Sequence, residues 1–203
     1  MDSTARKEQI FQTAGSMFSR QGYHATTMRD IARELNMQGG SLYAHIDSKE
    51  DMLWEIVERA AGQFLAAVQP LAALPEPASA RLWRMLRAHV DVVTRNLDNA
   101  TVFFHEWRFL SEPRRAQIAA QRDEYEALFR RVIQDGINAG EFPHADARMG
   151  ALLVLSAGNW LYQWFRPDGA LSAEAVAAQM ADVLIAGLHC VRPGADHSPD
   201  PGC

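Results

Sequence analysis

The sequence predicts an all-α protein, with a small N-terminal helix-turn-helix domain followed by a larger helical domain. Three observations lead to this prediction. Apolar residues recur at helical spacing along most of the 203 residues. No window shows the sustained alternation, bounded by hairpin signals, that is typical of strands. Glycine and proline fall at intervals that divide the chain into segments of helical length.

The first predicted helix covers residues 4–21. Ile10, Ala14 and Phe18 share one face of it. Gly22 follows at once, and glycine is the residue that most often ends a helix, because it adopts positive φ without strain. We expect this helix to pack across the two short helices that follow it.

Two short helices around a tight turn are predicted between residues 26 and 49. Thr27 is placed to cap the first helix, with Asp30 three positions later to complete a capping box. Asn36 ends that helix, and the second covers about residues 38–45. Ser48 caps the next helix, with Asp51 at its third position. Such a pair is a helix-turn-helix unit, whose second helix can lie in a DNA major groove.

The rest of the chain also reads as helical. The run from Pro70 to Pro77 breaks helix and predicts the clearest loop. We expect three regions: a helix-turn-helix domain over 1–50, a helical domain over 51–191 and a disordered tail over 192–203. The predicted helices beyond the turn cover residues 48–69, 78–97, 99–110, 113–139, 146–166 and 172–190.

Charge and cysteine content limit the class of protein. The net charge is −5, yet residues 1–50 hold six Lys/Arg and six Asp/Glu, so the remainder carries the whole excess. A nucleic-acid contact must therefore rest on placed residues and not on a basic tract. Cys190 and Cys203 form no CxxC pair, which favours a reducing cytoplasm. The N-terminus has no apolar signal segment, and the apolar run 150–165 is too short and polar for a membrane span.

The residue identities in the helix-turn-helix carry a family resemblance. Gly40-Ser41-Leu42-Tyr43, then His45, then Asp47-Ser48-Lys49-Glu50, closely resembles the TetR family of bacterial transcriptional repressors. Thr26-Thr27 fits the same pattern, whereas Ala44 and Ile46 stand where the family commonly has aromatic residues. The resemblance implies a cytoplasmic homodimeric repressor that binds a double-stranded DNA operator, with no enzyme activity and no cofactor.

The candidate DNA contacts follow from their side chains and this spacing. Phosphate oxygens suit hydroxyl, imidazole and ammonium groups, and base edges suit small or amide side chains that approach closely. Gly39 has no side chain to block the backbone. Singly, each of these residues is more often a packing or solvated group. The predicted contacts are Thr27, Tyr43, His45 and Lys49 for phosphate, Gln38, Ser41 and Ala44 for bases, and Gly39 for its open backbone.

Two aromatic clusters, at 103–109 and 160–165, predict either a packed helical core or a ligand pocket with a few polar groups. The segments 106–108 and 158–171 loosely resemble the subset of the family that responds to acyl-coenzyme A, so this effector is one alternative. Another lipophilic compound is the second, and a constitutive DNA-binding protein without a ligand is the third. The candidate ligand residues are His89, Phe104, Trp107, Arg108, Asn159, Trp160 and Trp164.

Other chemistry finds little support. There is no phosphate-binding glycine loop and no nucleophile elbow. Glu141 and His144 have metal-like spacing, but Pro143 between them makes a structural role more common.

Residues 146–166 and 172–190 are expected to pair with their copies in a dimeric four-helix bundle. The expected contact residues include Ala151, Leu155, Ala177, Ala181, Val183 and Leu188. The operator sequence, the regulated genes and the direction of any ligand effect stay open.

Overall fold

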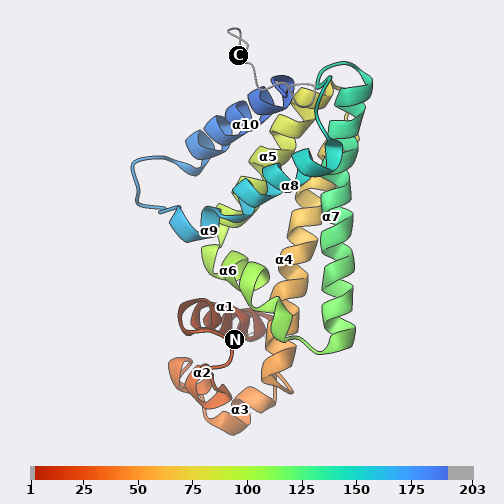
Figure 1. Ribbon diagram of the computed structural model, residues 1–203. Helices are drawn as coiled ribbons and strands as arrows, with labels where there is room; N and C mark the ends of the chain where they lie inside the picture. The colour runs from red at the N-terminus through yellow and green to blue at the C-terminus, as the bar shows by residue number, and fades with distance from the viewer. Residues whose placement is uncertain (1–2, 192–203) are drawn as a thin grey trace. The chain divides into compact units, whose positions relative to one another are not determined.

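The structure is a computed structural model that describes residues 3–191. Every regular element among these residues is helical, which confirms the predicted all-α class (Figure 1). The predicted tail over 192–203 lies outside the described residues.

The chain divides into two compact units. The first unit comprises Met1–Gln63 with Asn96–Arg122, and the second comprises Phe64–Arg95 with Asp123–Cys203. Two long helices, α4 (Lys49–Ala72) and α7 (Glu112–Asn138), each begin in the first unit and end in the second. The first unit therefore adds a segment from the middle of the chain to the predicted helix-turn-helix region.

The first unit is built around the helix-turn-helix. Its other elements are α1 (Ser3–Gln21), α6 (Leu97–His105) and the 3₁₀ helix η1 (Trp107–Phe109), with α2 (Met28–Glu34) and α3 (Gly39–Tyr43) forming the motif. Helix α1 packs on α2 and α6. It buries the predicted face and ends at Gly22, whose φ of +86° is the expected left-handed cap.

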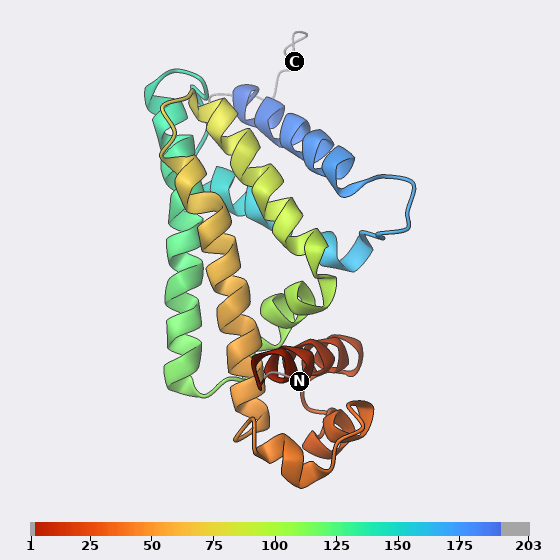
Figure 2. The same cartoon turned by 180° about the vertical axis from the view of Figure 1, so that it is seen from behind.

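The second unit is centred on α5 (Ala78–Arg95). This helix packs against α8 (Ala147–Asn159), α9 (Leu161–Trp164) and α10 (Ala173–His189). Figures 1 and 2 both show α5 and α10 side by side. Their shared core is apolar, and includes Leu82, Leu86, Val90, Ala177 and Ala181.

Three predicted boundaries are wrong. Helix α4 continues through Pro70 to Ala72, because a proline in the last turn removes only one backbone hydrogen bond. The predicted helix 99–110 stops at His105 and resumes as η1. The predicted helix 146–166 breaks at Trp160, which still makes the ordinary helical bond to the Ser156 carbonyl at 3.2 Å but is followed by a separate short helix, α9.

Candidate nucleic-acid interface

Helix α2 begins with the predicted capping box. The Thr27 hydroxyl accepts from the Asp30 N–H at 3.1 Å, and the Asp30 carboxylate accepts from the Thr27 N–H at 3.2 Å. The same hydroxyl donates to the carboxylate at 2.6 Å, and these hydrogen bonds lower the pKa of Asp30. The box fixes where α2 starts, and therefore where the turn and α3 follow.

The turn between α2 and α3 depends on Asn36, which has a φ of +52°. Asparagine tolerates this left-handed conformation better than most residues, and the Met37 N–H returns to the Ala32 carbonyl at 2.8 Å. Leu42 is fully buried and anchors α3. The opposite side of this short helix is thereby turned to solvent.

Most of the predicted DNA contacts lie on that exposed side. Tyr43 has 53% of its surface exposed, and His45 is half-buried. Gly39 has open space where a side chain would stand, so the backbone can approach a ligand closely. Gln38, Ser41 and Ala44 are exposed there as well, and Thr27 is exposed at the start of α2. Their contact with DNA stays a prediction.

A groove between α2 and α3 contains two arginines that the sequence reasoning missed. Arg29 and Arg33 line it together with Tyr43. Arg33 is paired with Asp30 at 2.6 Å, whereas Arg29 is exposed and makes no ion pair within residues 3–191. Their spacing of four residues places both on one face of α2, a signal that could have identified them.

Lys49, a predicted phosphate contact, turns toward the protein. Its ammonium donates to the carbonyls of Tyr23 at 2.8 Å and Thr26 at 2.9 Å, and it lies 4.2 Å from the centre of the Tyr23 ring. Burial lowers the pKa of this ammonium. The side chain thus holds the loop between α1 and α2, which carries the cap residue Thr27.

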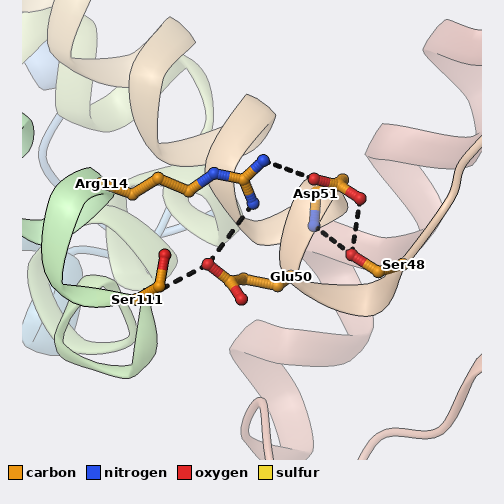
Figure 3. A network of polar contacts seen from close by, with 5 residues as sticks. All are labelled: Ser48, Glu50, Asp51, Ser111 and Arg114. Atoms are coloured by element: carbon orange, nitrogen blue, oxygen red, sulfur yellow. Dashed lines mark hydrogen bonds and ion pairs between the residues drawn. The ribbon is translucent and has the colours of Figure 1, made fainter.

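The first turn of α4 joins a polar network within the first unit (Figure 3). The Ser48 hydroxyl accepts from the Asp51 N–H at 3.1 Å, which confirms the predicted cap. Arg114 donates to Asp51 at 2.5 Å and lies 3.4 Å from Glu50. Glu50 also accepts from the Ser111 N–H at 3.0 Å. Hydrogen bonds from Ser111 lower the pKa of Glu50, and those from Ser48 lower the pKa of Asp51. The positive charge of Arg114 lowers both pKa values further.

The predicted ligand residues are divided between the two units. Phe104, Trp107 and Arg108 belong to the first. There the Arg122 guanidinium lies 5.2 to 6.0 Å from the ring centres of Phe103, Phe104 and Trp107. Arg108 is exposed and donates to the His105 carbonyl at 2.6 Å. Phe104 and Trp107 thus lie in one cluster of rings around Arg122.

The other four ligand candidates belong to the second unit. His89 is 1% exposed, and Asn159 is half-buried. Trp160 and Trp164 are exposed; Trp160 caps the end of α8, and Trp164 is the last residue of α9. The set of seven as one pocket stays a prediction.

Residues 3–191 contain no group of three or more potential metal ligands. Glu141 accepts hydrogen bonds from the Ala78 and Ser79 N–H groups at 2.8 and 3.0 Å and so caps α5. Burial opposes its ionisation, but a hydrogen bond from the Ser79 hydroxyl at 2.6 Å and the two N–H groups outweigh burial and lower the pKa of Glu141. No described helix has the length and apolar character needed to span a membrane.

Comparison with known proteins identifies the family. Residues 10–56 match the family model described as bacterial regulatory proteins of the tetR family, and residues 75–188 match that of the tetracyclin repressor-like C-terminal domain. The chain is 25% identical over 186 residues to the transcriptional repressor KstR2 of Mycolicibacterium smegmatis, covering 91% of each protein.

Solved structures agree with this assignment. The regulator PfmR from Thermus thermophilus matches with a TM-score of 0.81 and 31% identity, over 88% of this chain and 97% of that one. AibR, solved with isovaleryl coenzyme A and operator DNA, matches with a TM-score of 0.78 and 29% identity, over 91% and 98% of the two chains. The chain therefore belongs to the TetR family and is a DNA-binding transcriptional repressor rather than an enzyme.

Proposed function

We propose that this repressor binds an inverted-repeat operator as a homodimer and that an acyl-coenzyme A changes its operator affinity. The observation that carries the DNA part is the exposed side of α3, where Gln38, Ser41, Tyr43 and Ala44 face solvent while Leu42 is buried beneath them. A helix anchored from one side and polar on the other suits the major groove.

An exposed apolar surface on α8 and α10 supports the homodimer. Met149, Leu152 and Leu153 of α8 are 55%, 45% and 57% exposed, and Val183 of α10 is 72% exposed. Most of the contact residues expected from the sequence are unavailable, because they are buried within the chain itself; these are Ala151, Leu155, Ala177, Ala181 and Leu188. The proposed contact therefore uses the opposite faces of the same two helices, where burial against a second copy removes apolar surface from water.

The cluster of rings around Arg122 supports an acyl-coenzyme A over a cationic lipophilic compound. Aromatic rings suit an acyl chain, and a guanidinium among them attracts phosphate or a thioester oxygen while repelling a positive ligand. The AibR structure contains both isovaleryl coenzyme A and operator DNA, so an acyl-coenzyme A and an operator can occupy a protein of this fold together. Linkage requires that operator and thioester alter each other's affinity by the same factor.

A titration of the operator complex tests the effector. Fluorescence anisotropy of labelled operator is followed while isovaleryl, octanoyl and phenylacetyl coenzyme A, the free acids and coenzyme A alone are added. We expect a thioester to change the operator Kd at least fivefold, the lower end of ordinary coupling. At about a hundred times its Kd the same thioester raises stability by about 2.7 kcal/mol, which a melting experiment detects.

Matched variants separate the alternatives. Arg122→Met keeps an apolar stem among the rings but removes the cation, so the thioester effect should fall, whereas Arg130→Met, an exposed arginine further along α7, should behave as the wild type. If the free acid and its thioester change the operator Kd equally, the proposal that the effector is recognised through its coenzyme A group is wrong. If no compound changes the operator Kd, the aromatic rings are part of the packed core. The protein is then the constitutive DNA-binding protein without a ligand.

A further inference from the structure

The first turn of α4 is bound from two directions by groups of its own unit. Three successive residues reach three different places: Lys49 reaches the loop after α1, Glu50 reaches Ser111, and Asp51 reaches Arg114. This turn follows α3 directly in the chain, with only residues 44–48 between them. Whatever holds the turn therefore also limits how α3 can be oriented.

Tyr23 is the centre of the first attachment. Its carbonyl accepts from Lys49, and its N–H donates to the Glu106 carboxylate at 2.9 Å. Its ring is buried, packs edge-on against Phe18 at 5.3 Å and stacks with Phe109 at 6.0 Å. The loop before α2 is thus fastened to α4 on one side and to the joint between α6 and η1 on the other.

Arg114 is the centre of the second attachment (Figure 3). It is bonded to Asp51, lies beside Glu50 and packs over the Trp54 ring with its guanidinium carbon 5.5 Å from the ring centre. Its side chain is 31% exposed. Arginine suits this arrangement because its planar group binds carboxylates and an aromatic face at once.

We propose that Lys49 and Arg114 are positioning residues, which hold the first turn of α4 and hence α3 in the orientation that fits the operator. Lys49 would have to give up two charge-assisted hydrogen bonds and a ring contact to reach a phosphate. Arg114 is committed to the network described above. This inference rests on the proposed operator binding.

Salt dependence distinguishes a positioning residue from a phosphate contact. Each lost phosphate contact lowers the slope of log K against log salt by about 0.9. A positioning residue acts differently, because loosening the turn lowers the fraction of protein in the binding-competent form. The apparent Kd then rises by the inverse of that fraction, while the contacts in the complex, and so the slope, stay the same.

The experiment measures operator Kd at several salt concentrations for the wild type, Lys49→Met and Arg114→Met. We expect both variants to bind about tenfold more weakly with an unchanged salt slope, corresponding to a competent fraction of about one tenth. Arg114→Lys, which keeps a cation near Asp51, should recover part of the affinity. Arg115→Met is the matched control, since Arg115 pairs with Glu112 in the first turn of α7 itself, and it should bind as the wild type.

Each result decides a separate question. A slope reduced by about 0.9 in Lys49→Met makes Lys49 a phosphate ligand and overturns its positioning role. Wild-type Kd in variants that melt cooperatively overturns the proposal. If a methionine variant does not fold, Glu50→Gln and Arg114→Lys decide, because they leave a polar side chain at each position and change the network less than methionine does. A wild type that binds no operator overturns the proposed function and, with it, this inference.

Discussion

At the scale of single residues, His89 is a neutral imidazole in an apolar core. It is 1% exposed, its Nδ1 lies 2.9 Å from the Tyr125 hydroxyl, and its ring lies 5.1 Å from that of Phe64. Burial lowers the pKa of His89 to about 4 from an ordinary value of 6.5. A charged imidazole is therefore excluded from this core at neutral pH.

This burial predicts a pH dependence of stability. Above pH 6.5 the imidazole is neutral in both the folded and unfolded states and contributes no penalty. Between pH 6.5 and 4 only the unfolded state gains the proton, so the free energy of unfolding falls by about 3 kcal/mol in total. His89→Asn should flatten the fall of the urea midpoint between pH 7 and pH 5. His144 is exposed, so His144→Asn should show the same fall of the urea midpoint as the wild type. An equal fall in the His89 and His144 variants would contradict this explanation.

The sequence predicts individual side chains unevenly. The caps of Thr27 and Ser48 are local, so their partners three residues away could be foreseen and are confirmed. The partners of Lys49 and Arg114 lie more than twenty and more than sixty residues away, respectively. Only the folded chain shows that these cations face protein groups, because no local pattern encodes such contacts.

At the scale of elements, α8 depends on a glycine. A Cβ at Gly158 would lie 2.7 and 2.8 Å from the Cδ2 and Nε2 atoms of His89. Helices α5 and α8 approach closely there only because glycine has no side chain. Gly158→Ala should therefore lower the free energy of unfolding by about 1–3 kcal/mol through overpacking.

Gly62→Ala is the control, because its Cβ would meet open space in the exposed side of α4. That change should stabilise the helix by about 0.5–1 kcal/mol, since alanine loses less backbone entropy than glycine. Denaturant midpoints of both variants measure the difference. If Gly158→Ala leaves the free energy of unfolding unchanged, helices α5 and α8 can move apart without a cost in stability, which would contradict the prediction.

The apolar pattern of the sequence predicts which segments are helical better than it predicts where each helix ends. The periodic apolar faces of α1, α5 and α10 identified these helices, because each buries one stripe against neighbours. The interruptions at Glu106 and Trp160 carry no proline or glycine of their own, so no local breaker residue marks them in the sequence.

At the scale of the whole molecule, the exposed apolar residues of α8 and α10 predict self-association. Leu153→Glu and Val183→Glu place charges on the proposed contact, where burial without a partner is costly. We expect light scattering at micromolar concentration to change from dimer to monomer while the helical content is kept. Ala116→Glu, an exposed change on α7, should remain dimeric. A wild type that is monomeric would reject the proposed assembly.

The central claim is that the exposed side of α3 reads an operator with two-fold symmetry. The direct measurement is selection of bound duplexes from a random DNA pool by the purified protein at low salt. The account predicts an inverted repeat whose half-sites lie about one helical turn apart or somewhat more. Folded dimer that retains no duplex, or retains sequences without such symmetry, would contradict it.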